Sequence, residues 1–427
     1  MPRAPADYQI RHPIDFGDID SAVNQKVAQL YAADGGKSKG ILYWPARGKP
    51  KTAVIMAHPR VDFAHHYSIP FWVEAGFAAF GQNTRHLNND STMIHENLLL
   101  DLAAGIQFLR EEEGFRNVVM LGNSGGGSLF AYYDSEARAH AGQRVASPPG
   151  GGPPDLNKFE MPTADGFIAM AAHPGQGMVL MGSLDAAVID EGDPFATDPA
   201  LDMYDERNGF RTPPEQSRYD REWLERYRAG QRARVARIDA VARRHIAEAQ
   251  SARELTHARD FASAPHDYRN SAARRAMGPR MMIVYRQLAN PNYLDLTLDS
   301  SERSVGSIFS PRPDLSNYHA VGLGRIVTPN AWLSTWSALS SNANLLRNIA
   351  RVTVPTLVVG AMADQDIFPS DVRTQFEASG ATDKRLELVS GADHFMRAGG
   401  TKADQGDPRP RVMKLLTEWT RERFAPL

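Results

Sequence analysis

The stretch VVMLGNSGGGSLF, residues 118–130, decides the fold of this chain. An apolar run ends at Gly122, and Ser124 is followed by three glycines before a helical pattern begins. A sharp turn from a buried strand into a helix leaves no room for neighbouring β-carbons, and it lifts the serine hydroxyl clear of the sheet. The helix that follows aims its positive N-terminal end at that hydroxyl. The alternative interpretation is a glycine-rich turn with an incidental serine.

Other short apolar runs alternate with helical patterns along the chain. Buried strands separated by helices imply right-handed crossovers and a mainly parallel sheet that is covered on both faces. We therefore predict an α/β fold, a mainly parallel sheet flanked by helices. The predicted strands are 52–58, 76–84, 117–123, 165–173, 354–364 and 384–394, and the clearest helices are 95–114 and 411–424.

The pattern changes in the middle of the chain. Residues 213–250 are rich in Arg, Glu and Ala, which predicts one or two long helices with a solvated face. Residues 293–309 alternate and break at a polar turn, as a small hairpin does. We expect a core formed by 1–190 and 351–427. A mainly helical cap, 191–350, is inserted before the strand that bears the candidate acid.

Composition excludes several classes of function. The 427 residues are 42% hydrophobic and 23% charged, with a net charge of -2 and no cysteine. A basic excess that could neutralise nucleic-acid phosphates is missing, and thiolate chemistry and disulfides are excluded. No stretch approaches the ~18 apolar residues of a membrane helix, and the N-terminus has no secretory pattern. We expect a cytoplasmic protein that binds neither nucleic acid nor membrane; the sequence leaves open whether it forms a homodimer.

Two later residues complete a chemical constellation with Ser124. A serine hydroxyl is a poor nucleophile unless a base takes its proton. Asp364 and His394 each follow a predicted strand, in the order acid first and histidine last. Either residue alone is more often structural, as a helix cap or a packed imidazole. Three such residues in the expected order favour a catalytic triad, with Asp366 as a close rival for the acid.

The motifs GNSGGG, VPTLVVGAMAD and GADHF together resemble those of α/β-hydrolases. The resemblance covers roughly the first 190 residues and the last 75. It implies a triad of Ser124, Asp364 and His394, and no metal or organic cofactor. Asp364 keeps the expected distance from Pro355, although Gly360 lies one position earlier than the family's glycine.

The resemblance also implies an oxyanion hole of backbone N–H groups. Gly125, directly after the serine, supplies the first donor. The family's HG pair after an early strand is replaced here by MAHPR, with Pro59 in place of the glycine. Proline has no N–H, so we assign the second donor to Arg60, with Val61 as the alternative.

This resemblance implies a serine hydrolase that cleaves a carboxylic ester through an acyl-enzyme on Ser124. Aromatic residues of the cap and of the loop 62–72, together with the histidines and Arg85, favour a medium-sized, aromatic or oxygenated ester. One alternative is a hydrolase that uses the same triad to break a carbon–carbon bond in a β-diketone. The other is a non-catalytic protein that binds a small molecule on this scaffold. Sequence does not separate ester, lactone, thioester and amide substrates, because the bond that is broken depends on the shape of the pocket.

Several further residues are candidates for binding the substrate. His65 and His66 could also bind a metal, but no third ligand lies at a recognisable spacing, and we predict no metal site. Arg85 suits a carboxylate, although a structural ion pair is the favoured interpretation. His173 ends a strand, and a structural role is again favoured. The substrate-binding candidates are His58, His65, His66, Arg85, Tyr285, Trp332 and Trp336.

Overall fold

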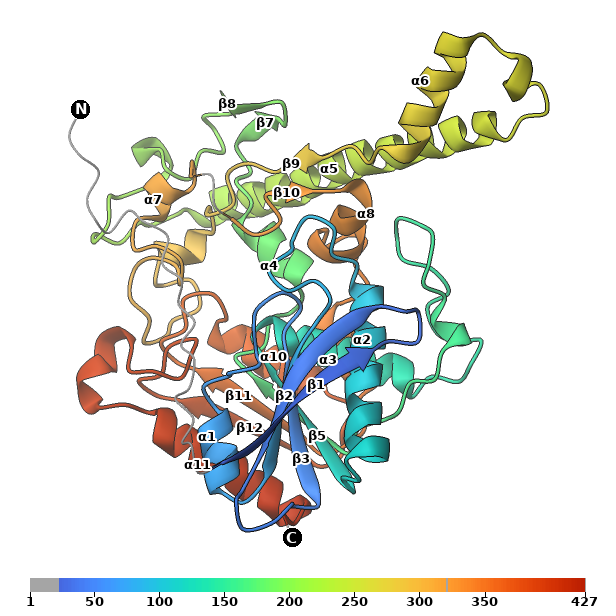
Figure 1. Ribbon diagram of the computed structural model, residues 1–427. Helices are drawn as coiled ribbons and strands as arrows, with labels where there is room; N and C mark the ends of the chain where they lie inside the picture. The colour runs from blue at the N-terminus through green and yellow to red at the C-terminus, as the bar shows by residue number, and fades with distance from the viewer. Residues whose placement is uncertain (1–22, 320–321, 427) are drawn as a thin grey trace.

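An eight-stranded sheet runs through the molecule (Figure 1). The computed structural model describes residues 23–319 and 322–426. The strand order is β1-β2-β4-β3-β5-β6-β11-β12, and neighbours are parallel from β4 through β12. The strands are β1 Asn24–Tyr31, β2 Lys37–Trp44, β3 Thr52–Ala57, β4 Ala78–Asn83, β5 Asn117–Asn123, β6 Gly166–Met170, β11 Thr356–Ala361 and β12 Lys384–Val389.

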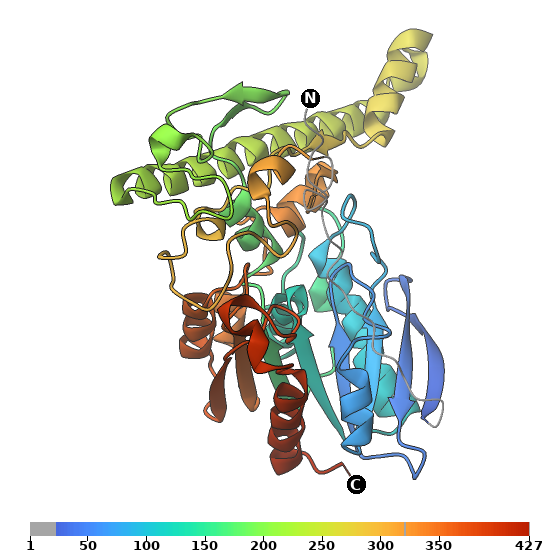
Figure 2. The same cartoon turned by 90° about the vertical axis from the view of Figure 1, so that its left-hand side faces the viewer.

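The central strands are continuous apolar runs because both of their faces are covered. All residues of β3, β4, β6 and β11 are buried. One face packs against α1 (Ile69–Glu74) and α11 (Arg409–Arg423), and the other against α2 (His95–Gln107), α3 (Gly125–Ala137) and α10 (Pro369–Ala378). Figure 2 shows these two helical layers on either side of the sheet. The predicted fold class is confirmed, and the chain has the α/β-hydrolase fold.

The first two strands were not predicted from the sequence. β1 and β2 pair antiparallel, and β2 pairs antiparallel with β4 at one edge of the sheet. Along β1 only Ala28 and Leu30 are buried, while Val27 and Tyr31 are 67% and 63% exposed. An edge strand with so few buried positions gives a weak apolar signal in the sequence.

Between β6 and β11 the chain leaves the sheet for a long inserted segment (Figure 1). Its main element is α5, 36 residues from Arg221 to Thr256, which begins where the Asp220 carboxylate caps the N–H groups of Glu222 and Trp223. The other elements are α4 Gln176–Ser183, β7 Val188–Asp190, β8 Asp193–Thr197, α6 His266–Met277, β9 Met282–Ile283, α7 Pro313–Ser316, β10 Ile326–Val327, α8 Pro329–Ala331, a π-helical turn Trp332–Trp336 and α9 Leu345–Ile349.

The predicted hairpin at 293–309 is wrong. The structure shows a short 3₁₀ turn, Pro291–Tyr293, followed by irregular loops. The Arg303 guanidinium is buried and donates to the carbonyl oxygens of Leu298 and Asp299 at 2.6 and 2.5 Å. An internal arginine therefore satisfies backbone groups that a strand partner would otherwise satisfy, and the alternation in the sequence reflects loop packing.

A buried carboxyl group ties the inserted segment to the core. Glu96, in α2, accepts hydrogen bonds from Ser334 at 2.6 Å, Asn342 at 3.0 Å and Tyr132 at 3.2 Å. Burial raises the pKa of Glu96, and these three donors oppose that shift. Two of the donors come from the inserted segment, so the network fixes that segment above α2.

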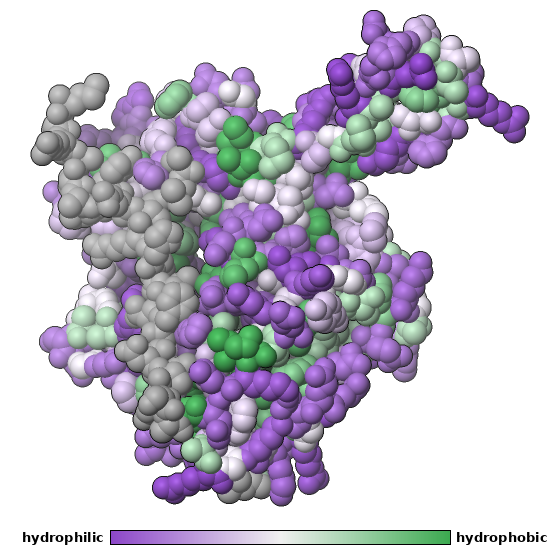
Figure 3. All heavy atoms as spheres, viewed as in Figure 1, coloured by the Kyte–Doolittle hydropathy of each residue, from purple (hydrophilic) through white to green (hydrophobic). Residues whose placement is uncertain are grey.

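The surface is mostly hydrophilic on the face shown in Figure 3. The hairpin of α5 and α6 projects from the body and carries hydrophobic side chains as well, among them Met277 and Tyr268, which are 76% and 47% exposed. Among the described residues, none of the helices combines the length and apolar character needed to cross a membrane.

Candidate active site

Ser124 sits in a strained turn between β5 and α3. Its φ is 57° and its ψ is -129°, a combination that residues with a β-carbon rarely adopt. The glycines around it allow close approach: a β-carbon on Gly126 would lie 2.3 Å from the Ala57 carbonyl oxygen, and one on Gly122 would lie 2.5 Å from Gly127 Cα. Strain of this kind persists only where the surrounding structure holds it, and it clusters at functional sites.

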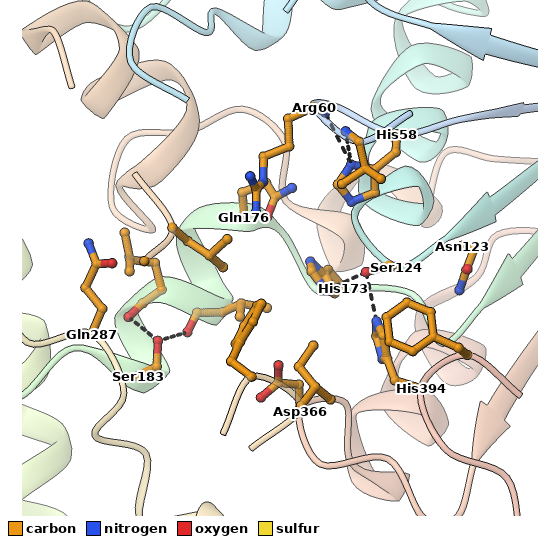
Figure 4. A pocket seen from close by; sticks show the side chains of 18 of the residues that line it. His58, Arg60, Asn123, Ser124, His173, Gln176, Ser183, Gln287, Asp366 and His394 are labelled. Carbon is orange, nitrogen blue, oxygen red and sulfur yellow. Dashed lines mark hydrogen bonds between the residues drawn. The ribbon is translucent and has the colours of Figure 1, made fainter. Parts of the chain in front are cut away.

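The three predicted triad residues form one hydrogen-bonded chain, and Figure 4 shows its link between Ser124 and His394. Ser124 Oγ lies 2.9 Å from His394 Nε2, and His394 Nδ1 lies 2.7 Å from Asp364 Oδ2. The acid follows β11 and the histidine follows β12, so the three side chains meet at the carboxyl ends of parallel strands. This arrangement lets His394 take the serine proton while the carboxylate fixes the imidazole tautomer.

The neighbouring Asp366 occupies a different position. The other oxygen of Asp364 accepts the backbone N–H groups of Asp366 and Ile367 at 2.9 and 3.0 Å, which orients its carboxylate. Asp366 instead lines the cavity beside Tyr293, and its Oδ1 has no hydrogen-bond partner among the described residues. Burial, together with the nearby Asp364, raises the pKa of Asp366 to about 6. The geometry favours Asp364 as the partner of His394.

Electrostatics single out His394 among the buried histidines of this site. Burial opposes the imidazolium of His394, but the Asp364 carboxylate outweighs burial and raises its pKa. Burial without a carboxylate partner lowers the pKa of His66 to about 4 and that of His173 to about 3. It also lowers the pKa of His58 well below the ordinary value. One histidine is therefore suited to proton transfer, and three are held neutral.

A second histidine contacts the serine. His173, three residues beyond β6, places Nε2 2.9 Å from Ser124 Oγ. The serine has one proton, and His394 Nε2 is the acceptor for it because Nδ1 of that ring donates to Asp364. His173 Nε2 must then carry its own proton and donate to a lone pair of Oγ. A structural role was favoured for His173 from the sequence, and the structure places its ring against the hydroxyl of Ser124.

The loop after β3 differs from the arrangement expected for the second oxyanion donor. The backbone N–H groups of Arg60 and Val61 both donate to Nδ1 of His58, at 3.2 and 3.1 Å. These were the two groups assigned to the oxyanion from the sequence, and both are already paired. The Gly125 N–H is different, since it belongs to the first turn of α3, where N–H groups have no acceptor within the helix.

A cavity of about 410 Å³ opens over the serine. Ser124, His173 and His394 lie at one end, and Gln287, from the inserted segment, lies at the other (Figure 4). The inserted segment, including α4, supplies much of the wall. The apolar lining residues are Val61, Phe63, Tyr67, Val179, Leu180, Leu288, Tyr293, Ile308, Phe309, Leu323 and Phe395.

Two of the seven substrate-binding candidates, His58 and His66, line this cavity. His66 is held by Ser68 and Asn123, at 2.8 and 3.3 Å. His65 is exposed and does not line the cavity.

The other four candidates lie outside the lining. Arg85 forms ion pairs with Asp34 and Asp101, at 2.6 and 2.7 Å, as the structural interpretation expected. The indole N–H of Trp332 donates to the Asp239 carboxylate at 2.7 Å, and that of Trp336 donates to the Asp90 carbonyl oxygen at 3.2 Å. Both rings therefore serve internal packing. Tyr285 is half-buried and does not line the cavity either.

Four lining residues that matter chemically were not assigned to substrate binding from the sequence: Gln176, Tyr293, Gln287 and His173. Only His173 carried a signal, its place after a strand. The others sit on a short helix and on loops whose position depends on the folded insertion. Within residues 23–319 and 322–426, no three His, Asp or Glu side chains are grouped so that they could hold a metal ion.

The chain combines an α/β-hydrolase fold with a hydrogen-bonded Ser–His–Asp chain. Solved structures resemble it at low identity. The esterase domain of a Rhodothermus marinus protein shares 11% identity over 93% of this chain and 98% of its own, with a TM-score of 0.41. The α/β hydrolase GrgF from Penicillium sp. sh18 shares 12% over 93% and 98%, with a TM-score of 0.45. DcsB, solved with a substrate analogue, shares 12% over 94% and 100%, with a TM-score of 0.48.

No protein-family model matches the chain, and no curated protein is similar to it in sequence. The structural likeness is too low to carry an argument about chemistry. The function is therefore argued from the site itself.

Proposed function

We propose that this protein is a serine hydrolase that cleaves a carboxylic ester through an acyl-enzyme on Ser124. The observation that carries the proposal is the continuous hydrogen-bonded chain from Asp364 through His394 to a strained serine that faces a cavity. A serine in a merely tight turn needs neither a buried base at 2.9 Å nor a carboxylate behind that base.

In the first half of the reaction, Ser124 Oγ attacks the carbonyl carbon of the ester while His394 Nε2 accepts its proton. The tetrahedral intermediate carries its negative charge on the former carbonyl oxygen. When the bond to the leaving alcohol breaks, His394 returns the proton to that alcohol. The Asp364 carboxylate stabilises the transient imidazolium, consistent with the raised pKa of His394.

In the second half, a water molecule takes the place of the alcohol. His394 accepts a proton from the water, the resulting hydroxide attacks the acyl carbon, and the Ser124 alkoxide leaves and recovers the proton from His394. The products are a carboxylic acid and an alcohol, and the enzyme returns to its starting state.

We propose further that residues 191–350 act as a cap that sets the choice of substrate. Leu288, Tyr293, Ile308 and Phe309 of this segment line the cavity opposite the core. The predicted core contributes more than expected, because α4, at Gln176–Ser183, also lines the wall. A cap of this kind closes the site and shapes the pocket.

The cavity supports a substrate with an apolar body and a polar end. Aromatic and aliphatic side chains form most of the wall, but Asp366 Oδ1 and both amide atoms of Gln287 are buried without partners among the described residues. An unpaired buried polar atom costs about 1–3 kcal/mol, so a substrate that supplies the missing partners is favoured. This supports an aromatic or oxygenated ester over a purely aliphatic one.

The proposal is tested with a fluorophosphonate probe, which reacts with an activated serine whatever the substrate is. We expect the parent protein to be labelled at Ser124, and Ser124→Ala to be inert and to lose nearly all ester hydrolysis. Equal labelling of both proteins at another residue, or equal turnover of an activated aryl ester, would show that Ser124 is not the nucleophile.

A substrate panel then tests the chemistry. Aryl, alkyl, lactone, amide, thioester and β-diketone substrates are compared, with Ser124→Ala as the blank. We expect an aryl or oxygenated ester to have the highest kcat/KM. A long-chain triglyceride as the best substrate would contradict the substrate class, and a β-diketone as the best would replace ester cleavage by carbon–carbon cleavage.

A further inference from the structure

His58 is the first residue after β3, and it is buried beside the serine turn. Its Nδ1 accepts two backbone hydrogen bonds, from Arg60 at 3.2 Å and from Val61 at 3.1 Å. A ring nitrogen that accepts two N–H groups cannot carry a proton. The neutral ring must therefore hold its single proton on Nε2, so the loop fixes the tautomer.

The protonated nitrogen lies next to the Gly125 backbone. A β-carbon placed on Gly125 would lie 2.8 Å from His58 Nε2 and 2.5 Å from the side-chain nitrogen of Gln176. Two side-chain donors thus converge on the residue whose own N–H is the first oxyanion donor. In Figure 4 the rings of His58 and His394 lie on opposite sides of Ser124.

We propose that the Nε2–H of His58 is the second donor of the oxyanion hole and replaces a backbone N–H of the loop. The proposal rests on the function proposed above. This proposal explains both why Pro59 can stand in place of the family's glycine and why the N–H groups of Arg60 and Val61 are already paired. The loop's N–H groups act on the Nδ1 side of the ring, and the ring delivers a donor on the Nε2 side. His58 is thereby a catalytic residue and not a packed imidazole.

The electrostatic setting suits this role. Burial and the nearby Arg60 guanidinium lower the pKa of His58 well below its ordinary value, which favours the neutral ring. A neutral donor avoids a permanent positive charge beside His394, which has to become positive during the reaction. Because the ring is fixed before the substrate binds, it stabilises the developing oxyanion without reorganisation.

Two substitutions separate catalysis from loop support. Asparagine places an acceptor near the position of Nδ1 and has nothing at Nε2, so His58→Asn keeps the contact with the loop and removes the donor. Glutamine places an amide nitrogen near Nε2, so His58→Gln keeps a donor and removes the acceptor. Each variant is assayed for kcat and KM with an aryl ester, for thermal unfolding, and for labelling by the fluorophosphonate.

We expect His58→Asn to unfold near the parent temperature and to lose about 100- to 1000-fold in kcat with little change in KM, the usual effect of removing one oxyanion donor. His58→Gln should retain more kcat than His58→Asn, even if it is less stable. The reverse order, with His58→Asn close to the parent and His58→Gln impaired, would assign His58 to loop support alone and overturn the proposal.

A measurement on the parent protein covers the case in which a variant does not fold. With ¹⁵N-labelled histidine, we expect His58 to show a proton on Nε2, and its signal to shift when a trifluoromethyl ketone forms a tetrahedral adduct on Ser124. A proton on Nδ1, or an Nε2 signal that the adduct does not change, would also overturn the proposal. Absence of any adduct or phosphonate label on the parent would instead contradict the proposed function.

Discussion

Replacing Gly125 by alanine tests whether the reaction requires the side-chain donors of His58 and Gln176 at their present positions beside Ser124. The residue is the first of α3, where alanine is a good helix former, so the backbone tolerates the change. The new β-carbon would lie 2.8 Å from His58 Nε2 and 2.5 Å from Gln176 Nε2. Ordinary contact begins near 3.4 Å, so the His58 ring must withdraw by about 0.6 Å and the Gln176 amide by about 0.9 Å.

A displacement of this size is large for a reacting site. A misplacement of about 1 Å costs on the order of 100-fold in rate, so we expect Gly125→Ala to lower kcat by roughly 10- to 100-fold. Thermal unfolding should shift by no more than a few degrees, since the β-carbon meets the ends of two side chains and no backbone. Steady-state kinetics with an aryl ester and a thermal melt measure both quantities.

Gly182→Ala in α4 is the matched control. It is also a helical glycine, but the nearest atom to its new β-carbon is Asn290 Nδ2, at 3.9 Å. We expect parent kcat and equal or slightly higher stability, because alanine favours a helix over glycine. If Gly125→Ala matches the parent and this control in kcat, the donors do not act on the reaction from the positions described.

Three other predictions concern the titrating groups. Asp364→Asn should lower kcat by about 10⁴-fold, as loss of the orienting carboxylate does in a serine triad, whereas Asp366→Asn should mainly raise KM for substrates with a polar end. Steady-state kinetics of both variants measure this, and a larger loss of kcat in Asp366→Asn would reassign the acid to Asp366. His394 acts as a base only when it is neutral, and Asp364 raises its pKa, so kcat/KM should fall as the pH drops, with a midpoint above the ordinary histidine value of ~6.5. A pH–rate profile measures this midpoint, and Asp364→Asn should move it to lower pH. His173→Phe should lower kcat by removing a donor to Ser124 Oγ while leaving that midpoint in place, since burial keeps the pKa of His173 at about 3; a shifted midpoint would mean that His173 titrates with the reaction.

Much of the fold could be predicted from the sequence because the central strands carry continuous apolar runs. Residues buried on both sheet faces have no polar alternation that could be confused with a helix, and so β3, β4, β5, β6 and β11 were found within a few residues of their ends. The constellation of Ser124, Asp364 and His394 followed from the glycine-rich turn at the serine, from the order of the three residues and from their places after predicted strands. By contrast, β1 is an edge strand with two buried residues, and its sequence gave no such run.

What could not be predicted depends on contacts between distant segments. Trp332 and Trp336 are large aromatic residues in the insertion, which made them candidates for the pocket, but their indole N–H groups bind Asp239 and Asp90. Gln287 reaches the cavity from a loop whose path no local pattern fixes. The pairing of His58 with two backbone N–H groups is likewise invisible in the sequence, although Pro59 signalled that the usual donor was missing.

The histidines of the site differ in the group that contacts Nδ1 of each ring. Behind His394 is a carboxylate, which favours the charged form and makes the ring a base. Behind His58 are two N–H donors, which exclude a proton from Nδ1 and fix the ring as a neutral donor. Burial favours neutral His173, whose Nδ1 has no partner among the described residues, and its contact with Ser124 Oγ assigns the proton to Nε2. Histidine thus has two opposite roles around Ser124. The group bonded to Nδ1 decides whether Nε2 accepts the serine proton, as in His394, or donates a hydrogen bond, as in His58.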